Sequence, residues 1–97
     1  MPYIEQRKRD RYETAIRMLV DDLLAFPDGL DGNLNYIIST LFYRIWLDNQ
    51  SYEKGNKLIG VLECVKLEFY RRVIAEYENE KTKINGDVFT PPKGDQS

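Results

Sequence analysis

The sequence contains no histidine, and this absence excludes more chemistry than any other feature of its composition. Histidine is the commonest general base in enzymes and the commonest nitrogen ligand of metals. Catalytic triads that use histidine, zinc fingers and HExxH metal sites are therefore impossible within one chain. From this we predict that the protein is not an enzyme and that it uses no metal and no cofactor.

Cysteine and long apolar runs are almost as scarce. The single cysteine, Cys64, cannot form an internal disulfide, so the chain does not read as a disulfide-stapled secreted domain. No window approaches the roughly 18 consecutive apolar residues expected of a membrane span. The first nine residues become charged at once and contain no apolar signal core. These absences predict a cytoplasmic protein with no membrane partner.

The composition that remains is that of an ordinary globular protein. The 97 residues are 42% hydrophobic and 31% charged, and the net charge is −2. This length predicts a single domain, which we place at residues 1–89, followed by a tail at 90–97. The one dense basic run, Arg7 to Arg11, alternates with Glu5, Asp10 and Glu13, so we interpret it as a solvated helix face and do not favour nucleic acid as a partner.

Apolar spacing predicts an all-α, three-helix domain. Residues 5–25 and 33–47 carry apolar side chains at intervals of three and four, with Asn33 as a possible N-cap of the second helix. The third helix is expected over residues 53–83, with a start between Ser51 and Asn56 and an end at Asn85-Gly86. Short extended arms at Tyr3-Ile4 and Val88-Phe89 should pack against the helices, and residues 90–97 should form a disordered tail.

Several segments, in a fixed order, also resemble those of a known family. The family consists of small uncharacterised proteins of bacteria, archaea and bacteriophages, without an established activity. The segments that carry the resemblance are Pro2-Tyr3-Ile4, Leu34-Asn35-Tyr36-Ile37, residues 59–72, Tyr77-Glu78 and Asn85-Gly86-Asp87-Val88. In this chain Glu76 replaces a proline expected before Tyr77, which implies that the third helix can continue through this point.

The third helix carries more apolar surface than one packing face requires. At 100° per residue, the first stripe contains Leu58, Leu62, Val65, Phe69 and Val73. A second, broadly opposed face contains Ile59, Leu67, Tyr70, Ile74 and Tyr77, with the small Gly60 allowing close approach. A helix with two apolar faces must be covered on two sides. We therefore predict a non-enzymatic interaction protein that self-associates, as a homodimer, through the second face.

Glu63 is the unexpected residue of that second face, because a carboxylate there needs a partner if it is buried. Lys66, an arginine of another helix or a second subunit could supply one. The alternative function is a binder of a phosphorylated or nucleotide-like ligand. Arginine binds phosphate and carboxylate groups through paired hydrogen bonds, and tyrosine rings can stack on bases. The residues that would form such an anion site are Arg44, Lys66, Arg71 and Arg72.

Overall fold

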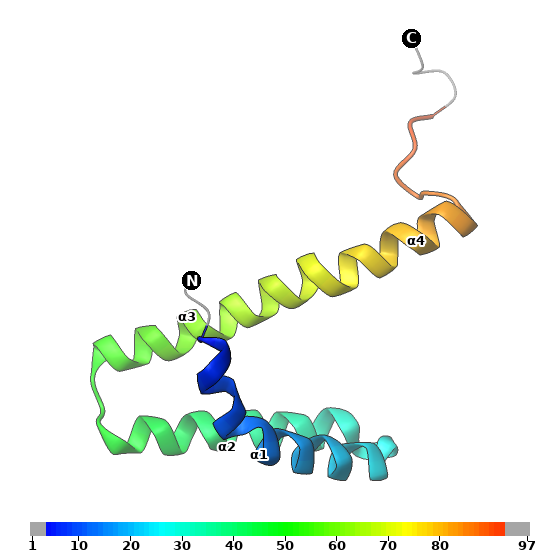
Figure 1. The fold of residues 1–97 in the computed structure, drawn as a ribbon. Helices are drawn as coiled ribbons and strands as arrows, with labels where there is room; N and C mark the ends of the chain where they lie inside the picture. Colours follow the sequence, from blue (N-terminus) through cyan, green and yellow to red (C-terminus); the bar gives the residue numbers. More distant parts are fainter. Residues whose placement is uncertain (1–3, 93–97) are drawn as a thin grey trace. The chain divides into compact units, whose positions relative to one another are not determined.

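The computed structural model of the protein describes residues 4–92, and within them the fold is all-α (Figure 1). The elements are α1 (Gln6–Ala25), a 3-10 turn η1 (Pro27–Gly29), α2 (Leu30–Asp48), α3 (Tyr52–Phe69), a π-helical segment η2 (Tyr70–Ile74) and α4 (Ala75–Asn85). Because η1 leads directly into α2, and α3, η2 and α4 follow one another without a gap, the described chain has three helical runs, at 6–25, 27–48 and 52–85. The predicted three-helix class is confirmed.

The chain divides into two compact units, and the boundary falls inside α3. The first unit, Met1–Leu58, contains α1, η1, α2 and the start of α3. The second unit, Ile59–Ser97, contains the rest of α3, together with η2 and α4. The second unit is therefore built on one long helix, and the two units are described separately below.

The second helix begins at Leu30 and not at the predicted Asn33. Pro27 opens the 3-10 turn, where its fixed φ is favourable, and the Gly29 N–H donates to the Phe26 carbonyl at 3.3 Å. The turn then runs directly into α2, so Asn33 lies inside the helix. A Cβ atom added at Gly29 would come within 3.2 Å of Asn33 Nδ2, so the exposed Asn33 side chain would have to shift to accommodate it.

The connection from α2 to α3 is well defined. Ser51 Oγ accepts the Lys54 N–H at 3.1 Å, which is the hydrogen bond of an N-cap, and α3 begins at the next residue as expected. Lys54 Nζ forms an ion pair with Asp48 at 3.5 Å across the turn. The Trp46 ring lies against Gly55, since a Cβ added there would meet the ring at 3.4 Å.

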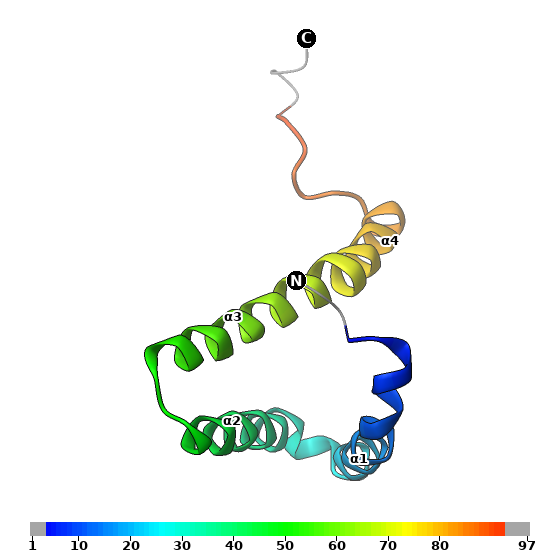
Figure 2. The same ribbon diagram turned by 60° about the vertical axis from the view of Figure 1, so that its left-hand side comes forward.

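The long helix continues past Glu76, as the missing proline implies, and the ribbon shows no break between α3 and α4 in a second view (Figure 2). It ends at Asn85, followed by Gly86 with a φ of +87°. The Gly86 N–H donates to the Thr82 carbonyl at 2.8 Å and closes the last turn. The sequence signal for this end is confirmed.

The terminal arms differ from the prediction. The described residues 4–92 include no strand, and Val88 and Phe89 are 84% and 91% exposed. The Phe89 N–H donates to the Asp87 carboxylate at 2.8 Å, a local turn that replaces the expected packing. Tyr3 and most of the predicted tail lie outside the described residues, and residues 90–92 carry no regular structure.

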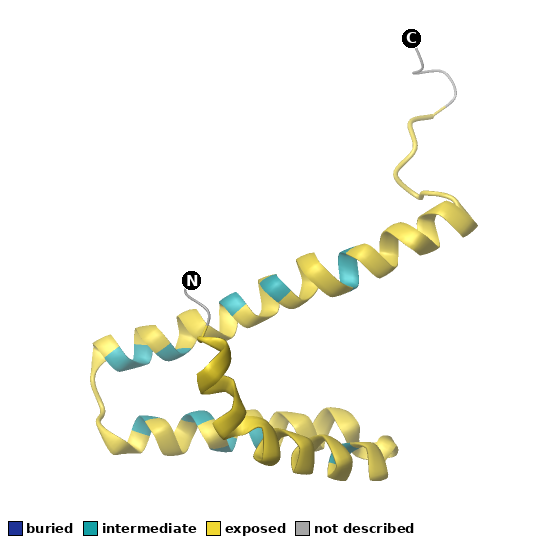
Figure 3. Cartoon of the chain, in the orientation of Figure 1, coloured by how far each residue is buried: buried dark blue, intermediate teal, exposed yellow. Residues whose placement is uncertain are grey.

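No residue between 4 and 92 is buried (Figure 3). In the first unit α1 and α2 contact one another, and their half-buried side chains include Leu23, Ile37, Phe42 and Trp46. In the second unit Cys64, Glu68, Ile74 and Ala75 are half-buried. A single helix has no second element to pack against, so the second unit cannot build a core from its own residues.

Candidate interaction surface

Large apolar side chains are exposed on more than one side of the second unit's helix. Leu67, on the predicted second face, is 55% exposed, and Phe69, on the first stripe, is 56% exposed. Such a helix in a water-soluble protein is normally covered by other elements. The exposed apolar residues of the helix are Ile59, Val61, Leu62, Val65, Leu67, Phe69, Tyr70, Val73, Tyr77 and Ile84.

The π-helical segment η2 separates the residues predicted to form the second face. The Ala75 N–H donates to the Tyr70 carbonyl, five residues back, where an α-helix would use a spacing of four. The rotation of 100° per residue therefore holds only as far as Phe69. By this rotation Tyr77 is turned about 100° away from Ile59, with which it would align in a uniform helix. Self-association through the second face stays a prediction.

Glu63 has a simple partner. Its carboxylate lies 3.3 Å from Lys66 Nζ on the same helix, and its side chain is 55% exposed. Of the partners considered from the sequence, the structure shows the local lysine. An exposed pair of this kind contributes at most about 1 kcal/mol. Glu63 is therefore a solvated residue here and not a buried carboxylate.

The predicted anion-binding residues lie on two units, and those of the second unit have acidic neighbours. Arg71 Nη2 lies 2.9 Å from Glu68 Oε1, and Arg72 Nη1 lies 4.0 Å from Glu68 Oε2. Lys66 pairs with Glu63, as described above. Arg44 lies on α2, in the first unit. Within the second unit, Lys66, Arg71 and Arg72 therefore each lie within 4.0 Å of a carboxylate oxygen.

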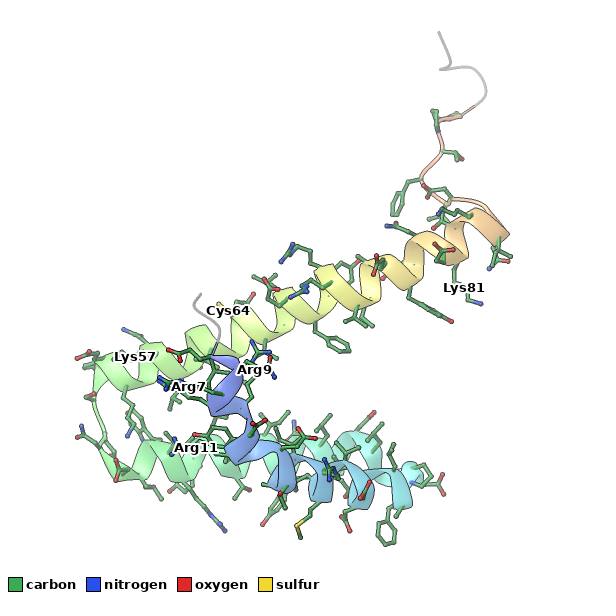
Figure 4. All side chains as sticks on the ribbon, viewed as in Figure 1. Arg7, Arg9, Arg11, Lys57, Cys64 and Lys81 are labelled. Carbon is green, nitrogen blue, oxygen red and sulfur yellow. The ribbon has the colours of Figure 1, made fainter. Side chains whose placement is uncertain are left out.

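The basic run near the N-terminus makes local contacts (Figure 4). Arg7 pairs with Glu5 at 2.8 Å, and Arg9 donates to the Ile4 carbonyl and to the Gln6 side chain at 2.9 and 3.0 Å. The Arg11 guanidinium lies 5.9 Å from the ring centre of Tyr12. These contacts are those of a solvated helix face, the interpretation that the alternation of charges favours.

Between residues 4 and 92, no group of three or more cysteine and acidic side chains is arranged to hold a metal ion. None of the helices in the same range combines the length and apolarity needed to cross a bilayer. Cys64, labelled in Figure 4, is half-buried and is not part of a disulfide.

Fold and surface together define a small all-helical protein whose distinguishing feature is a long, largely apolar helix. The chain belongs to the family described as domain of unknown function (DUF6899), which matches residues 1–88. The match covers nearly all of the described chain and agrees with the resemblance to an uncharacterised family. Neither the curated proteins nor the solved structures include a match to this chain.

Proposed function

We propose that this protein is a non-enzymatic interaction protein that self-associates through the apolar surface of its long helix, residues 59–85. A homodimer is the simplest such assembly, because two identical surfaces that contact one another close the assembly in one step. The observation that carries the proposal is the second unit itself: a single helix with ten exposed large apolar residues, and no second helix or strand among the described residues of that unit.

Hydrophobic association is the expected outcome for such a surface. Burial of apolar area gains roughly 25 cal/mol per Å², and large contiguous apolar patches on soluble proteins mark interaction sites. The local ion pairs of Glu63, Glu68 and their partners keep the charged side chains satisfied on the helix surface. The absence of histidine supports a non-catalytic role.

Sedimentation equilibrium tests this proposal directly. The protein should behave as a dimer at micromolar concentration and dissociate on dilution. A species that stays monomeric and soluble throughout the accessible concentration range would contradict self-association. In that case the ligand-binding alternative would become the next function to test.

A further inference from the structure

The π-helical segment acts as a one-residue insertion in the long helix. A π turn closes five residues back where an α turn closes four, so η2 holds one residue more than the α-helix would. Each residue of an α-helix advances by about 100°. All side chains after η2 are therefore turned back by about 100° relative to an uninterrupted helix.

One side-chain contact reports this rotation independently. The Tyr70 hydroxyl donates to Glu78 Oε2 at 3.4 Å, across eight residues. In a regular α-helix residues seven apart share a face, whereas residues eight apart are turned by about 80°. With one residue inserted, a spacing of eight behaves like a spacing of seven. The contact is thus a consequence of η2.

One apolar stripe, which we call the seam, follows the long helix on both sides of η2. Its six members are 38% to 74% exposed. They are Leu62, Val65, Phe69, Val73, Tyr77 and Ile84. Glu80 occupies the position between Tyr77 and Ile84. When one inserted residue is subtracted between Phe69 and Val73, the spacings along the seam alternate between three and four. This is the a/d pattern of a coiled coil, with Leu62 at a and Val65 at d.

We propose that the seam pairs with the seam of a second copy of this chain as a parallel, in-register coiled coil, and that η2 keeps the seam continuous across its inserted residue. This inference rests on the proposed self-association and specifies which face is used. It differs from the prediction made from a uniform helix, which placed the contact on the face of Ile59 and Leu67.

A hollow on the helix surface has the arrangement that coiled-coil packing requires. Each side chain of a coiled-coil seam inserts between four residues of the facing helix. An open hollow of the second unit is lined by Arg72, Val73, Glu76, Tyr77 and Glu80. Four of these residues, all except Arg72, lie at positions i, i+3, i+4 and i+7 of the helix. Four residues with this spacing form the hole that receives one side chain of the facing helix. A seam side chain of the partner helix can therefore fill it.

Charges beside the seam favour the parallel arrangement. Glu76 precedes the a position of Tyr77, which makes it a g position, and Lys81 follows the d position of Glu80, which makes it an e position. In parallel pairs g residues face e residues of the next heptad on the partner helix. Glu76 of one copy and Lys81 of the other then form an attractive pair, and symmetry produces it twice. Such pairs set the orientation and register of coiled coils.

Glu80 is the one charged side chain at a seam position. In a parallel pair the two copies of Glu80 face each other, which weakens the association. Lys83 Nζ lies 3.3 Å from the Glu80 carboxylate and offsets part of this repulsion. The substitution Glu80→Leu should therefore complete the seam and tighten the dimer. The matched control is Thr82→Leu, which adds a leucine on the opposite side of the helix, away from the seam.

The first experiment compares two lysine substitutions by sedimentation equilibrium of the full chain. Phe69→Lys lies on the seam and should raise the dimer dissociation constant by about 30-fold or more, since a central aromatic residue is removed from the interface. Leu67→Lys lies on the outer face and should leave the constant within about threefold. Circular dichroism at a concentration that maintains association checks that both variants keep their helices.

The possible results separate the two proposals. A wild-type chain that is monomeric at every concentration overturns self-association and the coiled coil together. A wild-type dimer that is dissociated by Leu67→Lys and not by Phe69→Lys overturns the seam alone. A variant that misfolds can also lose association. Glu80→Leu is therefore included, because it should strengthen the dimer. It should lower the dissociation constant about tenfold, and Thr82→Leu should not; equal effects of the two would contradict the seam.

Changes of length at η2 test the inserted residue, and a charge exchange tests the orientation. Deletion of Arg72 removes the insertion and should preserve the dimer, whereas insertion of one alanine after Arg72 turns the later seam by about 100° and should dissociate it. Equal loss in both would overturn the role of η2. Glu76→Lys and Lys81→Glu should each weaken the dimer, and their combination should restore it; a double variant as weak as the single ones would overturn the parallel register.

Discussion

The Tyr70 hydroxyl contacts the Glu78 carboxylate across eight residues of one helix, which a regular α-helix does not bring onto one face. Their 3.4 Å contact depends on η2, where Tyr70 is the first residue. The helix on either side of η2 is regular, and the extra residue sets the rotation of the apolar residues after it relative to those before it. A local irregularity of the backbone thus determines which side chains can act together.

This contact is exposed, so its energetic contribution should be small. Tyr70→Phe removes the hydroxyl and should lower the free energy of unfolding by less than about 1 kcal/mol. A double-mutant cycle with Glu78→Gln, followed by urea unfolding, measures the coupling between the two side chains. A coupling of zero would contradict the contact, while a coupling of several kcal/mol would show that the pair is buried.

Ser51 should stabilise the start of α3. Ser51→Ala removes the acceptor of the Lys54 N–H and should lower the free energy of unfolding by about 1 kcal/mol. The matched control is Ser39→Ala inside α2, where the serine donates to the Asn35 side chain at 3.3 Å. Alanine favours the helix interior, so this control should be neutral or slightly stabilising. Equal losses in the two variants would contradict the capping role.

Two glycines of the second unit should respond in opposite ways to alanine. Gly86 has a φ of +87°, which alanine rarely adopts, so Gly86→Ala should destabilise the helix end by about 1 kcal/mol. Gly60 lies inside α3, and a Cβ added there meets no atom within 4 Å. Gly60→Ala should therefore stabilise the helix by about 0.5–1 kcal/mol.

Gly60→Ala also distinguishes the two faces of the long helix. If a partner approached closely at Gly60, as the two-faced interpretation of the sequence expects, the added methyl group would weaken association. If the seam forms the contact, the dimer dissociation constant should stay within about threefold of the wild type. Sedimentation equilibrium of Gly60→Ala and Gly86→Ala measures association. Thermal unfolding of the same two variants measures stability separately.

Thermal unfolding should depend on the concentration of the protein and not on nucleotides. Association with a second copy stabilises the folded state by mass action, so a tenfold increase in concentration should raise the Tm. Added ATP, GMP or inorganic phosphate should leave the Tm unchanged, since Arg71, Arg72 and Lys66 already lie beside carboxylates. A nucleotide-dependent shift that Arg72→Ala abolishes would favour the ligand-binding alternative.

The helices themselves could be predicted because their signals are local. Ser51 marks the start of α3 and Gly86 marks the end of the long helix, and each acts through hydrogen bonds within a few residues. The start of α2 could not be placed as well. Asn33 is a good N-cap residue type, but the turn at 27–29, which starts with proline, leads directly into the helix at Leu30.

The faces of the long helix were harder to predict. A uniform rotation of 100° per residue assigns Ile74 and Tyr77 to the second face, with Ile59 and Leu67. No single residue type in the sequence indicates the change of helical pitch at η2. The sequence nevertheless contains a sign of it. The apolar positions 69, 73 and 77 are each four apart, where a seam alternates between three and four. An extra residue in an otherwise regular repeat is a signal for a π-helical segment.

The sole tryptophan of the chain, Trp46, lies against Gly55 at the turn between α2 and α3, in the first unit. Its fluorescence therefore reports on that turn, whereas the circular dichroism signal averages over all the helices. When the two signals are followed together during dilution or denaturation, the first unit acquires its own spectroscopic probe. A fluorescence midpoint that differs from the dichroism midpoint would reveal that the two units melt in separate steps.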